Sequence, residues 1–194
     1  MLDKQKPPCG APLPPAQFDQ SISTQHACLD ERFLAASPFD DRDHFARFLR
    51  LQLRLHFVTL PYCSDPEIQG LLPSLGNVDR LTEILADCRE VGISEKALAE
   101  DIVAARAASC SEKLAAMGWI YVQEEACIRV VMLFRGAEML AAIPDEHCVR
   151  YLSDQHETRN RCWQQLTQDL DALPLSDALR LQVLQGAKAA LYFI

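Results

Sequence analysis

Several patterns that would place this chain in a common functional class are missing from its sequence. The eight cysteines form no C-x-x-C pair and no zinc-type spacing, and no glycine-rich nucleotide-binding loop is present. No apolar run is long enough to cross a bilayer, and the proline- and lysine-rich start does not resemble a secretory leader. A zinc module, an iron–sulfur protein, a nucleotide-binding protein and a membrane-spanning protein are therefore all disfavoured.

Positive charge is scarce as well. The 19 lysines and arginines are outnumbered by 27 aspartates and glutamates, which gives a net charge of −8 and a pI near 5.1. Such a balance argues against nucleic acid or an anionic membrane as the main partner. The scattered cysteines and the missing leader favour a cytoplasmic protein with reduced thiols. The alternative is a disulfide framework, which is typical of small secreted domains.

Prolines mark off the beginning of the chain. They cluster within residues 1–15, where they oppose helix formation, and we expect a flexible N-terminal arm there. We expect residues 16–194 to form one folded domain. The remaining length lies within the usual range of a single domain, and 49% of the chain is hydrophobic, which is enough for a sizeable core.

The rest of the chain carries helical periodicity and no competing strand signal. Apolar residues recur at three- and four-residue steps, and the Ser-Glu-Lys-Ala sequence that begins at Ser94 is typical of a helix start. The pattern predicts an all-α fold of roughly seven to nine helices. The expected helical segments are 17–36, 41–60, a short turn in the proline-rich connector that follows, 77–92, an interrupted stretch over 94–140, 146–152, 157–172 and 176–194.

The most informative local pattern surrounds His26. Asp30 follows four residues later, so in a helix the imidazole and the carboxylate lie on one face. An imidazole can bind a metal through one ring nitrogen when a carboxylate or a water holds the other in the right tautomer. His26 is therefore a candidate metal ligand, and the alternative is a solvent-facing or core histidine near a helix start. His56 lies in an apolar segment and is expected to be a core or boundary histidine.

Three separated segments together resemble the bacterial heme oxygenases of the iron-acquisition type. The first is the histidine with its following acid at His26. The second is residues 38–48, Pro-Phe-Asp-Asp-Arg-Asp-His-Phe-Ala-Arg-Phe, an almost letter-by-letter match, and the third is residues 118–124, Gly-Trp-Ile-Tyr-Val-Gln-Glu. The resemblance runs from about Gln17 to the C-terminus. It implies a heme oxygenase-like, multi-helical single domain in which His26 and the helix around Glu125 face each other across a cleft.

This resemblance implies the opening of heme to biliverdin with O₂ and electrons, and the release of iron and carbon monoxide in iron metabolism. Heme would be both substrate and cofactor, with His26 as the axial ligand of its iron and Asp30 as the support of that imidazole. Tyr121 occupies an aromatic position that faces the pocket, and Arg135 would replace a lysine that holds a heme propionate, whereas Leu34 stands at the other such position. The electrons would come from an external ferredoxin or flavoprotein reductase, and neither nucleic acid nor a membrane is an expected partner.

The chain departs from the family in the distal-helix motif. The family sequence Glu-Gly-Ser-x-Leu-Gly is Glu-Glu-Ala-Cys-Ile-Arg here, so Glu125 and Arg129 replace two glycines that let the backbone lie close over the heme iron. The two residues could pair on an exposed helix surface. If they instead point into the distal pocket, they must be paired, solvated or bound to a ligand. Two alternatives therefore stand beside the enzyme. One is a non-catalytic member that binds heme, another tetrapyrrole or a polar ligand, and the other is a helical interaction protein without a ligand.

Overall fold

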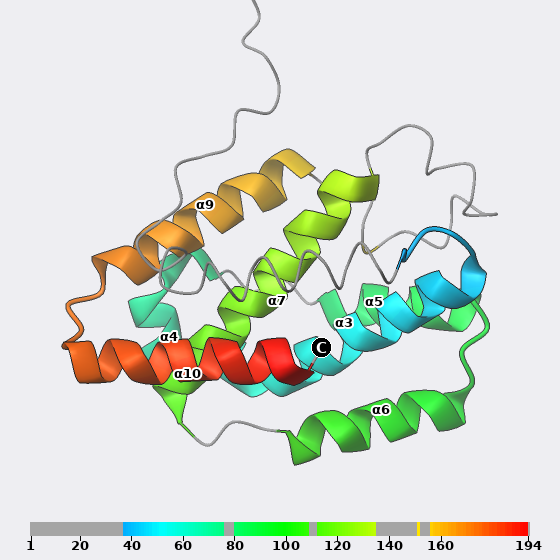
Figure 1. Cartoon of the computed structure of the whole chain (residues 1–194), viewed down its shortest axis with the longest axis horizontal. Coiled ribbons are helices and arrows are strands. Elements are labelled where there is room, and N and C mark those ends of the chain that lie inside the picture. Colours follow the sequence, from blue (N-terminus) through cyan, green and yellow to red (C-terminus); the bar gives the residue numbers. More distant parts are fainter. Residues whose placement is uncertain (1–36, 76–79, 109–111, 135–150, 152–155, 194) are drawn as a thin grey trace, which may run out of the picture.

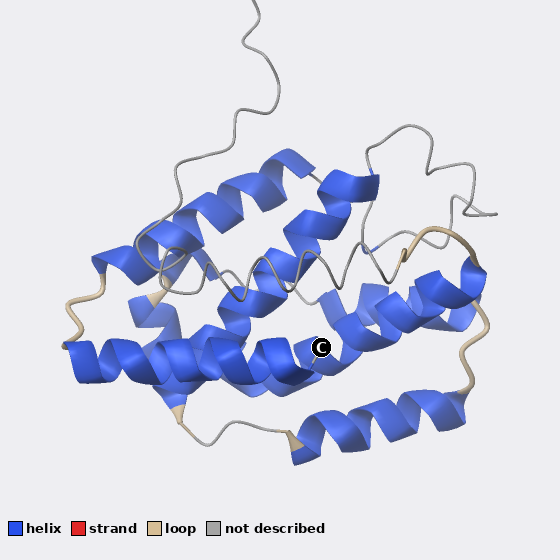
Figure 2. Cartoon of the chain, viewed as in Figure 1, coloured by secondary structure: helices blue, strands red, loops and turns tan. Residues whose placement is uncertain are grey.

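The regular elements of the structure are helices. The computed structural model describes residues 37–75, 80–108, 112–134, 151 and 156–193 (Figure 1). Its α-helices are α3 (Arg42–Cys63), α4 (Pro66–Leu71), α5 (Arg80–Glu90), α6 (Glu95–Ala107), α7 (Lys113–Phe134), α9 (His156–Ala172) and α10 (Asp177–Phe193), and η1 (Pro73–Leu75) is a short 3-10 helix. Figure 2 shows no strand within the described residues, so the predicted all-α fold class is confirmed.

Part of the expected organisation lies outside the described residues. This applies to the N-terminal arm over 1–15, to the helix over 17–36, and to all of the helix over 146–152 except Tyr151. The domain boundary after residue 15 therefore stays a prediction. Among the described helices, none is both long and apolar enough to cross a membrane.

The structure corrects one helix boundary expected from the sequence and locates another. The sequence predicts that α3 ends before Pro61, but the helix continues to Cys63. This prediction was wrong because Pro61 lies in the last turn. There its missing N–H removes one helical hydrogen bond and its ring crowds the carbonyl group four residues earlier, a local cost compared with the packing of the preceding turns. The interruption expected within 94–140 lies between α6 and α7.

Side chains fix where several helices begin and end. Ser94 accepts a hydrogen bond from the backbone N–H of Ala97 at 3.2 Å, as its helix-start sequence predicts. Arg42, in the first turn of α3, reaches the end of α5. Its guanidinium donates to the carbonyl oxygens of Glu90 and Val91 at 2.8 and 3.2 Å. Because a helix C-terminus leaves its last carbonyl groups without helical partners, this arginine both caps α5 and ties it to α3.

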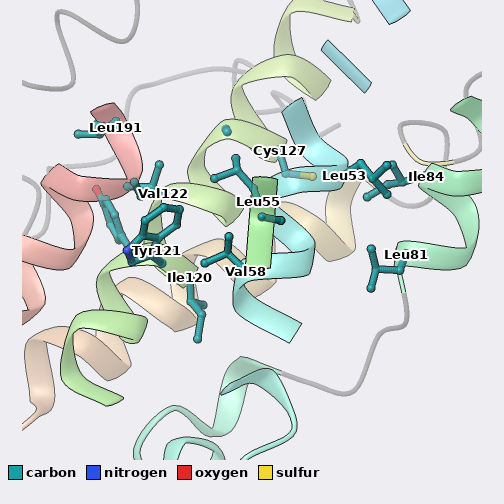
Figure 3. Packing of buried hydrophobic residues seen from close by; sticks show 14 of the residues in the cluster. Leu53, Leu55, Val58, Leu81, Ile84, Ile120, Tyr121, Val122, Cys127 and Leu191 are labelled. Atoms are coloured by element: carbon teal, nitrogen blue, oxygen red, sulfur yellow. The ribbon is translucent and has the colours of Figure 1, made fainter. Parts of the chain in front are cut away.

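The hydrophobic core is built around α3 and α7. α3 packs against α5, α6 and α7, and the most extensive contact between described helices is that of α7 with α10. Figure 3 shows buried side chains of four helices: Leu53, Leu55 and Val58 of α3, Leu81 and Ile84 of α5, Ile120, Tyr121, Val122 and Cys127 of α7, and Leu191 of α10. The helix that carries the distal-type motif is therefore part of the core rather than a surface element.

Candidate functional site

α7 is buried along most of its length. From Ala116 to Ile128 every residue except Glu124 is buried, and Glu124 itself is only partly exposed. A helix buried on all sides is normally apolar all round. This one instead carries a glutamine and two glutamates in its middle, at residues 123–125. Because an uncompensated buried charge is strongly destabilising, each of these side chains needs partners inside the protein.

Glu125 and Arg129 form an ion pair within α7. The Arg129 Nε donates to Glu125 Oε1 at 2.7 Å, and the Arg129 Nη2 also contacts this oxygen. The Glu125 side chain is 2% exposed and that of Arg129 is 28% exposed. The two glycine positions of the family motif thus hold a carboxylate in the interior and a guanidinium that reaches from it toward the surface. The sequence allowed either an exposed or a buried pair, and the structure shows the carboxylate buried.

A second ion pair joins α7 to α5. The Arg80 Nη1 donates to both carboxylate oxygens of Glu124, at 2.5 and 2.7 Å, and the two side chains are only 10% and 14% exposed. The amide of Gln123 donates to Glu124 Oε1 at 3.0 Å. Burial alone would raise the pKa of Glu124, but the charge and hydrogen bonds of Arg80 outweigh it, so the pKa lies below its usual range. Glu124 is therefore a carboxylate at neutral pH.

The sequence analysis missed the Arg80–Glu124 pair, although α5 carries a signal for it. Arg80, Ile84 and Asp87 recur at helical spacing and are all buried. Two charged residues within a buried stripe indicate that each has a partner on another element. For Arg80 this partner is Glu124, and for Asp87 it is the backbone N–H of Tyr151, which donates to its Oδ2 at 2.9 Å.

Three buried polar side chains, those of Gln52, His56 and Tyr151, contact one another beside α3. The Tyr151 hydroxyl lies 2.9 Å from Gln52 Oε1, to which it donates, and 3.2 Å from His56 Nε2. The rings of His56 and Tyr151 meet edge to face, with centroids 5.7 Å apart. His56 is thus the satisfied core histidine that the sequence predicts. The Gln52 Nε2 is buried and has no hydrogen-bond partner among the described residues, so an acceptor atom there would be stabilising.

Thr59 connects this polar group to the ion pair. It lies one turn after His56 on α3, and its hydroxyl contacts the side-chain oxygen of Gln123. The positive potential of His56 also contributes to the low pKa of Glu124, after the larger influence of Arg80. Buried polar side chains of α3, α5 and α7 therefore lie close together in the core.

The aromatic residues of α7 lie in the core. Tyr121 is fully buried and its ring contacts that of Trp163 of α9, with centroids 5.0 Å apart. Trp119 is 4% exposed, and the centroid of its ring lies 5.3 Å from that of Phe193 of α10. This confirms core packing for Trp119. The side chain of Phe134, for which core packing is also predicted, lies outside the described part of the structure.

Comparisons with known proteins agree with this architecture. No protein-family model matches the chain. Heme oxygenase PigA of Pseudomonas aeruginosa is 26% identical over 165 residues, which cover 85% of this chain and 81% of PigA. The NO- and CO-bound heme oxygenase of Neisseria meningitidis has a similar structure, with a TM-score of 0.69 over 91% of this chain and 85% of that one, at 22% identity. The chain is heme oxygenase-like. The resemblance stated from the three sequence segments is thereby confirmed.

The described residues contain only part of the predicted site of this heme oxygenase-like protein. Tyr121, Glu125 and Arg129 lie on α7 at successive spacings of four residues. His26, Asp30 and Arg135 lie outside the described residues, as does Leu34. The predicted cleft between His26 and Glu125 therefore stays a prediction.

The chemistry available on α7 is that of two charge-neutral pairs. Glu124 with Arg80 is tied to the rest of the core, whereas Glu125 is neutralised by an arginine of its own helix. Within the described residues, no group of three or more histidine, cysteine, aspartate or glutamate side chains could hold a metal ion. A heme needs no such cluster, because its porphyrin supplies four ligands to the iron and one side chain can supply the fifth.

Proposed function

We propose that this heme oxygenase-like protein binds heme and opens it oxidatively to biliverdin, with release of iron and carbon monoxide. The similarity to PigA over most of both chains and the fold shared with the Neisseria heme oxygenase support the proposal. The observation that carries it is the position of α7. The segment that resembles the family's distal helix is a buried helix in the centre of the core. Such a helix can serve as one wall of a site for a large, mostly apolar substrate.

In this proposal the chain holds heme through residues from several segments. His26 would bind the iron, Asp30 would support the imidazole, and Arg135 would grip a propionate through two parallel hydrogen bonds. Tyr121 would belong to the pocket wall, with its ring held in place by Trp163. Bound heme supplies the iron at which O₂ reacts. The electrons would come from a ferredoxin or flavoprotein reductase in the cytoplasm, since the chain has neither a nucleotide-binding loop nor a cysteine cluster.

The partly buried ion pair at the two glycine positions favours a second candidate function. The protein would then bind heme, another tetrapyrrole or a polar ligand without opening it. Glycines permit a close approach of the backbone, whereas Glu125 and Arg129 add two long side chains at the same positions. Because the two side chains neutralise each other, they can remain beside an apolar ring, where they would occupy space that O₂ needs.

A heme titration tests the proposal. We expect hemin to give the native protein a saturable Soret band that is lost in His26→Ala. The matched control is His44→Ala, which should keep the band, because His44 lies at the start of α3 and its side chain is 32% exposed. The absence of a saturable band in the native protein would contradict heme binding and favour an interaction protein without a ligand.

Turnover distinguishes the two heme-binding functions. With a ferredoxin and its reductase under air, the enzyme is expected to lose the Soret band while biliverdin and carbon monoxide appear. A band that persists after reduction, with no biliverdin formed, would contradict the enzyme and favour the non-catalytic binder. Hydrogen peroxide scavengers belong in both assays, because free peroxide bleaches heme without producing biliverdin.

A further inference from the structure

α7 and α10 approach each other closely at two glycines. A methyl group on Gly118 of α7 would overlap the carbonyl oxygen of Val183 and the amide nitrogen of Ala187 on α10. A methyl group on Gly186 of α10 would overlap the carbonyl group of Ala115 on α7. All of these neighbours are backbone atoms, which cannot turn aside as a flexible side chain can. The two helices therefore cross backbone to backbone, and this distance is possible only because both positions lack a Cβ.

The glycine crossing lies within a larger contact that braces α7. α10 crosses the N-terminal part of α7 in Figure 1, and this helix pair has the most extensive contact in the described fold. Beyond the crossing, Phe193 packs on Trp119, and the Arg54 guanidinium of α3 lies 5.8 Å from the centre of the Phe193 ring. α10 therefore constrains the position of α7, and its Phe193 contacts both α7 and α3.

The crossing is close enough to the distal-type segment to affect where that segment lies. Glu125 follows Gly118 by seven residues, or about 10 Å along a helix that rises 1.5 Å per residue. Helix axes at contacts lie about 8–10 Å apart, depending on the side chains between them, so added methyl groups would move the axes apart by about 1–2 Å. A continuous helix carries such a shift from Gly118 to Glu125. A misplacement of about 1 Å can reduce the rate of an enzyme about a hundredfold.

We propose that Gly118 and Gly186 are positioning residues, which set the depth of α7 in the core and thereby the position of residues 124–129 in the heme site. The inference rests on the proposed heme binding for its ligand-based readout. Neither glycine touches the substrate in this proposal. Between the crossing and Glu125, the Arg80–Glu124 pair ties α7 to α5, so a shift at the glycine crossing has to move or strain this ion pair as well.

The test compares Gly118→Ala and Gly186→Ala with two controls. Gly70→Ala is the matched glycine control, because Gly70 is also helical but has nothing within 4 Å of an added Cβ. Leu98→Ala is the stability control, since Leu98 is buried on α6, which packs on α3 and away from the crossing. We expect the heme Kd to rise about tenfold or more in both crossing variants, with a shifted Soret maximum. The heme Kd of Gly70→Ala should stay within about twofold of the native value.

Hydrogen exchange separates this inference from the proposed function. Amides of residues 119–129 should exchange at least about tenfold faster in the apo forms of Gly118→Ala and Gly186→Ala than in Leu98→Ala of matched Tm. This readout holds even if the native protein binds no heme, an outcome that would end the proposed function alone. Equal exchange and equal heme affinity in crossing variants and controls would overturn the positioning role.

A milder variant covers the case in which the alanine variants do not fold. Phe193→Leu loosens α10 against Trp119 without introducing a clash at the crossing. We expect it to change exchange in residues 119–129 and heme affinity in the same direction, by a smaller factor. If Phe193→Leu folds and leaves both quantities at native values, α10 does not position α7 and the inference is wrong.

Discussion

Removing Arg80 should destabilise the protein far more than removing an arginine from a surface pair. In Arg80→Met, the Glu124 carboxylate would keep the hydrogen bond from Gln123 at 3.0 Å but lose its ion-pair partner. Breaking a buried ion pair by removing one member costs about 3–5 kcal/mol. For a domain of this size the loss corresponds to a decrease in Tm of about 6–20 °C.

The chain contains a matched control for this change. Arg89 and Glu95 form an arginine–glutamate pair at a similar distance, 2.7 Å, but their side chains are 54% and 71% exposed. Exposed pairs contribute about 0–1 kcal/mol, so Arg89→Met should have little effect. In the double variant Arg80→Met with Glu124→Met, both charges disappear together, and most of the lost stability should return.

The stability lost in Arg80→Met should depend on pH in a defined direction. In the native protein the pKa of Glu124 lies below its unfolded value, so the contribution of the pair is present at neutral pH. It is lost as the pH falls through the folded pKa. In Arg80→Met, burial without the cation should raise this pKa above the unfolded value of about 4.3, and protonation then relieves the buried charge. The stability difference between native protein and variant should therefore shrink between pH 7 and pH 4.

Urea unfolding followed by tryptophan fluorescence at pH 7 and pH 4 measures these differences, because Trp119 is buried on the same helix as Glu124. If Arg80→Met costs no more than Arg89→Met at pH 7, the Arg80–Glu124 pair does not behave as a buried ion pair. A stability difference that grows toward pH 4 would refute the assigned direction of the pKa shift.

Four further predictions concern the candidate site and the buried polar side chains of the core. Glu125→Gly with Arg129→Gly should tighten heme binding and increase biliverdin formation if the pair obstructs the pocket, although each glycine costs the helix up to about 1 kcal/mol. Arg129→Gly alone should be less stable in urea than the double variant, by up to about 3–5 kcal/mol, because it leaves the Glu125 carboxylate buried without this arginine. In side-by-side titrations the native protein should bind heme about tenfold to a hundredfold more weakly than PigA, since Leu34 makes no charged contact with a propionate. Tyr151→Phe should lower the unfolding free energy by about 1–3 kcal/mol, as it removes the hydroxyl that donates to Gln52.

The helices could be predicted from the sequence because their signals are local. Ser94 caps α6 through a bond to an amide three residues away, and apolar periodicity extends over whole segments. Pro61 shows the limit of such rules. Proline is unfavourable inside a helix, but near the end of α3 only one hydrogen bond is lost, and the gain from packing the preceding turns is kept.

The candidate site could be predicted only as far as its contacts are local. The pairing of Glu125 with Arg129 follows from their spacing of four residues, but the burial of Glu125 depends on how other segments cover α7. The Arg80–Glu124 pair joins positions 44 residues apart, and no local pattern links two such positions. The motif resemblance identified α7 as important, whereas its attachment to α5 is a property of the three-dimensional packing.

The exposure of Glu125 decides between the ways in which the fold could accommodate a charge at a glycine position. If α7 had moved outward to place the new pair in solvent, both side chains would be exposed, but that of Glu125 is 2% exposed. A glutamate alone at this buried position would lack the counter-charge of Arg129, and the arginine of α5 already binds Glu124. Arg129 supplies that charge one turn away on the same helix. The two departures from the glycine motif thus form one pair, and in the proposed heme site they would present a neutral ion pair where the family motif has bare backbone.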